Sequence, residues 1–247
     1  MADAYIPYAP LNLLKPVADN VWIVDGPEID MKYLGLKLPF PTRMTVVRLA
    51  DGGLFVHSPI APDASLMDHV AALGEVRHLI APNNLHYWYM ADWKARFPGA
   101  KVHAVSRLRQ EARRPFIVDA LLEDVAPPAW RAEIDQVLIE ARLLAECDFF
   151  HRPSGTVILT DLIENFEAAR IKPLLLRWIM RLSHVTDPHG SAPYDMRMSF
   201  RGHRRSLHAG VRRMLAWPAQ RVIIAHGRWF ERDGVREMAR AFAWVGT

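Results

Sequence analysis

The stretch His78-Leu-Ile-Ala-Pro-Asn-Asn-Leu-His86-Tyr-Trp-Tyr89 sets a short apolar run directly against polar and aromatic side chains. The apolar run is typical of a buried strand, and Pro82 with two asparagines ends it. In α/β proteins the polar groups of a site lie in the loops at strand ends. The stretch therefore predicts a strand that delivers His86 to a site.

Two later stretches repeat this pattern, namely Thr156-Val-Ile-Leu-Thr-Asp161 and Arg221-Val-Ile-Ile-Ala-His-Gly227. Each apolar run ends on a carboxylate or an imidazole. Three such runs in one chain favour a shared site. Imidazole and carboxylate are the ligands that Zn²⁺ or Fe²⁺ takes in proteins.

Further apolar, β-branched runs bounded by turn residues predict strands. Apolar residues recur at helical spacing in three places, which predicts three helices. One follows Pro62 and Asp63, one spans 207–215, and one follows Asp233. No linker or repeat divides the chain, so we expect an α/β fold in which helices cover the sheets. The further strands are expected at Val21–Val24, Met44–Leu49, Leu54–His57, Val102–Val105, Val137–Ile139 and Phe149–His151.

The composition limits the classes of function that the chain can have. Hydrophobic residues make up 51% of the 247 residues and charged residues 23%, which leaves material for a sizeable core. The net charge of +4 is spread along the chain without a nucleic-acid-binding motif, so we expect no nucleic-acid partner. The single cysteine, Cys147, excludes an internal disulfide and is expected to be a buried thiol. Residues 1–16 lack a signal-peptide pattern and no run suits a transmembrane segment, so we expect a cytoplasmic protein.

The order of these elements resembles the metallo-β-lactamase superfamily, most closely a divergent branch with an eroded ligand motif. Thr156–Asp161 is similar to the strand that ends in the family's metal-bridging aspartate, and Val222–Gly227 to the strand that ends in its last histidine ligand. The resemblance implies a four-layer α/β/β/α sandwich. One domain would span residues 1–247, with a helical and loop insert at about 166–202.

The family's H-x-H-x-D-H motif falls on a segment that keeps only its second histidine, His86. The other motif positions are Asn84, Trp88 and Tyr89. The family's middle histidine would fall between Ala141 and Cys147, where Glu146 offers only an oxygen donor. The resemblance thus implies a reduced site of His86, Asp161 and His226, holding one zinc or iron ion or none.

Other residues near the expected cleft have two interpretations each. His57 and Ser58 occupy the region where the family usually has an aspartate that supports the metal site. His57 either rebuilds a polar site or is a hydrogen-bonded core histidine. Asn84 offers a carbonyl oxygen. Tyr87 and Tyr89 either stack on a ligand or pack between elements. Without a metal, His86 and Asp161 would remain as an acid–base pair.

The segment 162–189 is both basic and strongly apolar. A helix over about 163–182, with its apolar stripe at Leu174–Leu182, is expected to bend near Pro173. Four arrangements of this helix stay open. It is buried with its arginines reaching water, or it covers the site as a lid. Otherwise it lies on a membrane surface or forms an interface in a homo-oligomer. The chain from Thr186 to Gly202 is expected to be a long loop.

The resemblance implies a hydrolase that acts on a small ester, lactone, thioester or related acyl compound, with His86 and Asp161 as catalytic residues. Two alternatives stay open. The chain would be a non-catalytic module that binds a small-molecule ligand and has lost the metal, or a mononuclear iron oxidoreductase using the same residues.

Overall fold

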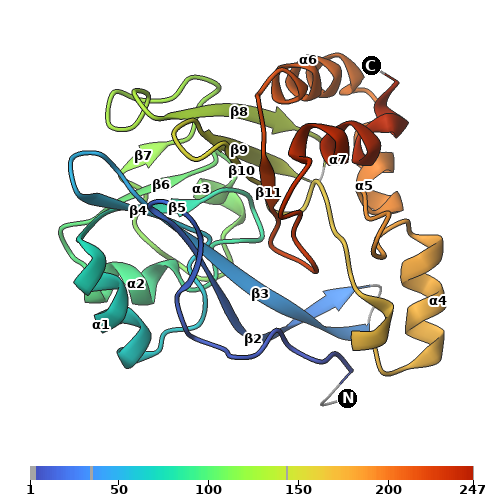
Figure 1. Cartoon of the computed structure of the whole chain (residues 1–247), viewed down its shortest axis with the longest axis horizontal. Helices are drawn as coiled ribbons and strands as arrows, with labels where there is room; N and C mark the ends of the chain where they lie inside the picture. The colour runs from blue at the N-terminus through green and yellow to red at the C-terminus, as the bar shows by residue number, and fades with distance from the viewer. Residues whose placement is uncertain (1–3, 34–35, 143, 247) are drawn as a thin grey trace.

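Two sheets lie face to face between helices in the computed structural model, which describes residues 4–33, 36–142 and 144–246 (Figure 1). In the first sheet the strand order follows the chain, β1 (Lys15–Ala18), β2 (Val21–Tyr33), β3 (Leu36–Arg48), β4 (Gly53–His57), β5 (Glu75–Ala81), β6 (Lys101–Ala104) and β7 (Ala120–Leu121). Strands β1 to β4 are antiparallel and β4 to β7 are parallel.

The second sheet has the order β11-β10-β9-β8. Strand β10 pairs with β11 in parallel and with β9 antiparallel, so the strands before Asp161 and His226 end at the same edge. This pairing brings together two residues far apart in the sequence. The strands are β8 (Ile134–Glu140), β9 (Ala145–His151), β10 (Thr156–Ile158) and β11 (Arg221–Ile223).

Helices cover the outer face of each sheet. Helices α1 (Ala64–Leu73) and α2 (Met90–Arg96) contact β5 of the first sheet. Helices α6 (Arg204–Leu215) and α7 (Gly234–Ala241) contact β8 and β11 of the second. The predicted four-layer α/β/β/α arrangement is therefore confirmed. The short helix α3 (Leu108–Glu111) and two 3-10 turns, η1 (Ala168–Arg170) and η2 (Ala243–Val245), connect these elements.

The main core lies between the sheets and is sealed by aromatic rings. Phe55 of the first sheet meets Phe149 of the second edge to face, with ring centroids 5.2 Å apart. Trp130 packs on the same Phe55 ring at 5.2 Å. Full burial of side chains of this size stabilises the fold by about 2–3 kcal/mol each. These aromatic rings therefore join the two sheets within the core.

All nine predicted strands are present, with boundaries shifted by a few residues. Strands β1 and β7, which have four and two residues, were not predicted. Asp63 caps helix α1, because its side chain accepts a hydrogen bond from the Leu66 N–H at 2.8 Å.

Two expectations for the insert are wrong. Helix α4 (Leu174–Leu182) begins directly after Pro173 and has no bend there, because a proline without an N–H is compatible with a helix start. The expected loop 186–202 contains helix α5 (Tyr194–Ser199). No helix in the described part of the chain is long and apolar enough to cross a membrane.

Candidate metal centre

His86 reaches the site through a tight turn after β5. The side-chain oxygen of Asn83 accepts hydrogen bonds from the N–H groups of Leu85 and His86, both at 2.8 Å. Asparagine side chains stabilise such turns by replacing a backbone acceptor. The turn therefore positions the imidazole of His86 directly beyond the strand end.

Asp161 follows β10 and is 3% exposed. Its Oδ2 accepts a hydrogen bond from Nδ2 of Asn83 at 2.6 Å. Its backbone N–H donates to the buried carboxylate of Glu146, with N–O distances of 3.1 and 3.0 Å. These contacts leave Oδ1 as the carboxylate oxygen that faces the two histidines.

His226 follows β11 and lies between the sheets. Its Nδ1 donates to the carbonyl oxygen of Pro41 at 2.8 Å, which leaves Nε2 of the neutral ring with a lone pair. Phe40 packs edge-on against the imidazole at 5.3 Å and Phe166 stacks on it at 6.3 Å. Gly227 has a φ of +97°, and a Cβ there would lie 2.2 Å from the Asn165 carbonyl oxygen, so the turn after His226 requires glycine.

The three ligand atoms form a nearly equilateral triangle. Nε2 of His86 lies 3.3 Å from Oδ1 of Asp161 and 3.2 Å from Nε2 of His226. The His226–Asp161 distance is 3.1 Å. In a tetrahedral zinc site with bonds of roughly 2.0–2.2 Å, donor atoms lie about 3.3 Å apart. The triangle therefore fits one face of a tetrahedron, with a fourth position open.

No other group of three metal-ligating side chains occurs within the described ranges. Two imidazoles and one carboxylate are a donor set that zinc and iron(II) both accept. The residues present thus fit a single divalent ion.

Electrostatics couple the three residues. Burial opposes ionisation of Asp161, but the adjacent His86 and His226 outweigh it and hold the pKa of this carboxyl well below its usual range. Burial likewise disfavours a charged His86, yet the Asp161 and Glu146 carboxylates raise the pKa of its imidazole. The two carboxylates therefore stabilise a proton on His86, and protons compete with a metal for this ring.

Ser58 supports His86 from the opposite side of the ring. Its hydroxyl lies 2.7 Å from Nδ1 of His86. When Nδ1 carries the proton and donates it to Ser58, Nε2 is free to bind a metal. Ser58 directly follows β4 and has a φ of +53°, a region that costs energy for a residue with a Cβ. The sequence offered no specific signal for this role.

Glu146 was predicted as an oxygen ligand for a metal. In the structure its carboxylate is not one of the three ligand atoms of the triangle. Its carboxylate accepts hydrogen bonds from Asn83 Nδ2 and from the backbone N–H groups of Thr160, Asp161 and Leu162. It therefore shapes the loop that carries Asp161. Asp148, on the same strand, is fully buried, and burial followed by the neighbouring Glu146 raises its pKa well above the usual range.

The structure does not bring Asn84, Tyr87, Tyr89 or His57 into the triangle of ligand atoms. Asn84 accepts a hydrogen bond from the Ala145 N–H, and Tyr87 is buried with its hydroxyl accepting from the Arg113 N–H. Tyr89 is partly buried against the core, and burial raises the pKa of its hydroxyl. His57 is buried, and this burial lowers its pKa to about 3.

Asn83 was not predicted as a site residue. It connects the turn before His86 to the loop that carries Asp161. Its amide donates to Asp161, Glu146 and Thr160, while its oxygen holds the turn before His86. The only signal was its place beside Asn84 at a strand end. Cys147 is buried as expected, and burial raises the pKa of its thiol.

The fold is similar to that of solved metallo-β-lactamase structures. The crystal structure of DIM-1 metallo-β-lactamase is similar with a TM-score of 0.62 at 12% identity, covering 95% of this chain and 96% of that one. A metallo-β-lactamase from Pontibacter korlensis gives 0.60 at 10% identity, covering 95% and 99%. The Flv1 flavodiiron core from Synechocystis sp. PCC6803 gives 0.60 at 11%, covering 95% and 60%.

The resemblance to the metallo-β-lactamase superfamily is confirmed at the level of the fold. The chain belongs to the family described as a domain of unknown function, DUF4336, whose model matches residues 18–174. No curated protein matches the chain.

Proposed function

We propose that the chain is a metal-dependent hydrolase with a mononuclear site, in which His86, Asp161 and His226 hold one zinc or iron ion. The observation that carries the proposal is the triangle of ligand atoms, with sides of 3.1 to 3.3 Å. Both histidines have partners at Nδ1, which orient their Nε2 atoms toward the same point.

The substrate class is a small ester, lactone, thioester or related acyl compound. When bound, the ion supplies Lewis acidity and lowers the pKa of a water to about 7. The protein contributes orientation: Asn83 and Glu146 fix Asp161, while Ser58 and the Pro41 carbonyl fix the histidines. The charge of Asp161 compensates the ion within a largely buried site.

Of the expected substrate contacts, we retain Tyr89. Trp88 beside it is 41% exposed, so this turn presents aromatic surface next to His86. The hydroxyl of Tyr87 and the side-chain oxygen of Asn84 both accept hydrogen bonds from backbone N–H groups, and His57 is buried. These three residues serve the packing around the site in the proposed enzyme.

A second candidate is a mononuclear iron oxidoreductase. The observation that favours it is the donor set itself, because two histidines and one carboxylate on one face with open positions are typical of non-haem iron(II) enzymes. The flavodiiron core among the similar structures shows that the fold also occurs in an iron protein.

The test uses the full chain loaded with zinc or iron(II) and assayed on p-nitrophenyl acetate, γ-butyrolactone and an acyl thioester. We expect hydrolysis that chelator abolishes and that falls at least a hundredfold in Asp161→Ala. The control His189→Ala, an exposed histidine, should keep full activity. Oxygen uptake by the iron form without hydrolysis would favour the oxidoreductase. Neither activity in either loaded form would favour a non-catalytic binding module.

A further inference from the structure

Helix α4 turns its apolar side toward solvent. Five of its nine residues are large, apolar and 46% to 75% exposed, whereas most other exposed large apolar side chains among the described residues are scattered. Their spacing of i, i+1, i+4, i+5 and i+8 places them on one arc of the helix. We call these five residues the outer arc: Leu174, Leu175, Trp178, Ile179 and Leu182.

The opposite side of α4 fixes this orientation. Leu176 and Met180 pack on a small cluster that contains Phe166 and Val185. The helix lies at the edge of the molecule, beside the long β2–β3 hairpin (Figure 1). Because the inner side is anchored, the outer arc points away from the protein, and α4 does not cover the metal centre with it. The expectation that this stripe is buried is wrong.

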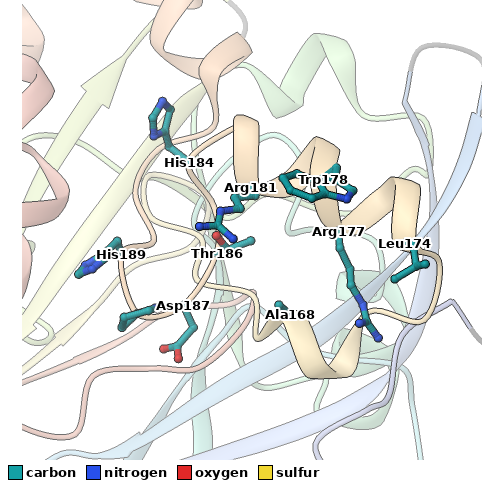
Figure 2. A pocket seen from close by; sticks show the side chains of 10 residues that line it. Ala168, Leu174, Arg177, Trp178, Arg181, His184, Thr186, Asp187 and His189 are labelled. Carbon is teal, nitrogen blue, oxygen red and sulfur yellow. The ribbon is translucent and has the colours of Figure 1, made fainter.

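Positive charge borders the outer arc. No acidic residue occurs between Ala168 and Thr186, a stretch with four arginines or lysines. A hollow of about 600 Å³ lies along one edge of the outer arc, where Leu174 and Trp178 line it (Figure 2). Arg177 and Arg181 of α4 also line it, together with His184 and His189 from the following segment. Asp187 is the carboxylate in this lining, and its Oδ1 accepts a hydrogen bond from Asn165 at 3.0 Å.

We propose that this face docks on an anionic lipid surface, with the outer arc in the acyl boundary and the phosphate groups at the arginine-lined hollow. A helix with a leucine and tryptophan face bordered by arginines binds in the interfacial plane of a bilayer. Each arginine near an anionic leaflet adds to the attraction. The arrangement is charge-complementary to lipid phosphates.

A second copy of the chain suits this face less well. A two-fold interface through the outer arc would bring Arg177 and Arg181 of both copies together without an intervening carboxylate on the helix. Like charges at such an interface repel. Lipid phosphates instead supply the missing negative charge.

The test measures co-sedimentation of the full chain with vesicles of phosphatidylcholine alone and of phosphatidylcholine with phosphatidylglycerol. Wild type should bind the anionic vesicles at least tenfold more strongly. The triple variant Leu174→Ser, Trp178→Ser and Leu182→Ser should bind on the order of a hundredfold more weakly. Arg177→Gln with Arg181→Gln should bind on the order of ten- to thirtyfold more weakly, and wild type should be released by high salt.

Matched controls carry the same chemistry elsewhere on the surface. Ile117→Ser with Val125→Ser removes two side chains that are 65% and 74% exposed, and Arg201→Gln with Arg205→Gln removes two exposed charges. Both controls should bind vesicles like wild type. All variants should keep the wild-type melting temperature, because the replaced side chains are exposed or border solvent.

Four results would overturn the proposal. The first is that wild type does not prefer anionic vesicles. The second is that the control variants lose as much vesicle binding as the α4 variants. Light scattering would show a dimer that the triple variant dissociates, which would assign the face to a subunit interface. Inorganic phosphate at constant ionic strength would displace the protein from vesicles, which would assign the hollow to free phosphate.

Discussion

Nδ1 of His86 lies 2.7 Å from the hydroxyl of Ser58, and this contact determines which ring nitrogen of His86 faces Asp161 and His226. A histidine ligand generally needs such a partner, because the group at the second nitrogen fixes both the tautomer and the ring plane. A neutral serine fills that place here. The metal centre therefore depends on a residue that binds no metal itself.

Replacing Ser58 by alanine should weaken zinc binding by about 10- to 100-fold, because the imidazole of His86 loses its orientation. Competition with a chromophoric chelator measures the change. Ser154→Ala is a matched control, since its hydroxyl makes an equally short contact of 2.7 Å with Nδ1 of His151. Equal effects of the two substitutions would contradict the role assigned to Ser58.

Asn83 should contribute to stability more than its neighbour Asn84. Asn83→Ala removes one hydrogen bond from each of the buried carboxylates of Asp161 and Glu146, and it removes the acceptor of the Leu85 and His86 N–H groups. We expect a loss of about 2–4 kcal/mol in the free energy of unfolding, measured by urea titration. Asn83→Asp should lower the free energy of unfolding further, because it places a third carboxylate beside those of Asp161 and Glu146. An Asn83→Asp protein as stable as wild type would rule this account out.

Arg43 links the first sheet to the loop that carries His226. It is buried, pairs with Asp25 and donates to the carbonyl oxygens of Ile224 and Gly227, both at 2.8 Å. Arg43→Met should cost about 3–5 kcal/mol, because the buried Asp25 carboxylate keeps only Lys15 as an ion-pair partner and two carbonyl oxygens lose their donor. Arg77→Met removes two solvent-exposed ion pairs, with Asp51 and Glu75, and should change the free energy of unfolding far less. Urea titration of both variants gives the comparison.

Stability should fall in mild acid. Burial lowers the pKa of His78 and of His103 to about 4, and the two rings contact each other at 3.2 Å. Both are lowered from about 6.5 in the unfolded chain, so below that pH the unfolded state binds more protons than the folded state. Their contribution to stability is present above pH 6.5 and is lost as the pH falls toward 4.

The expected slope is on the order of 1 kcal/mol per pH unit for each histidine between pH 6.5 and 4. Urea titrations from pH 7.5 to 5 measure it. His103→Gln should reduce the slope of the unfolding free energy against pH by the contribution of one histidine, on the order of 1 kcal/mol per pH unit. A variant whose stability depends on pH as steeply as wild type would show that His103 is not the group responsible.

The sequence predicted the fold because strands and core helices have strong local signals. The runs 54–57, 78–81 and 222–225 are mostly apolar and are followed by turn or polar residues, and each one is a strand or its direct extension. Strands β1 and β7 were missed because they are short and pair only at sheet edges. Their few residues carry no periodic signal.

The site was predicted in part. His86, Asp161 and His226 were expected to converge, and the structure places their ligand atoms within 4.8 Å of one another. The supporting residues Asn83 and Ser58 have no distinctive local pattern, since their roles arise from contacts between loops far apart in the chain.

The direction of the α4 stripe also could not be predicted. Amphipathic spacing shows that a helix has an apolar face, but the spacing does not tell what covers that face. In α4 the covered side is the narrow one that carries Leu176 and Met180. The wide side faces solvent.

The most direct test of the central claim is elemental analysis of the full chain purified without a metal-affinity column. Wild type should hold about one zinc or iron ion per chain, and Asp161→Ala with His226→Ala should hold none, while His189→Ala matches wild type. A metal content in wild type far below one ion, unchanged in the double variant and not restored by added zinc or iron, would contradict the metal centre.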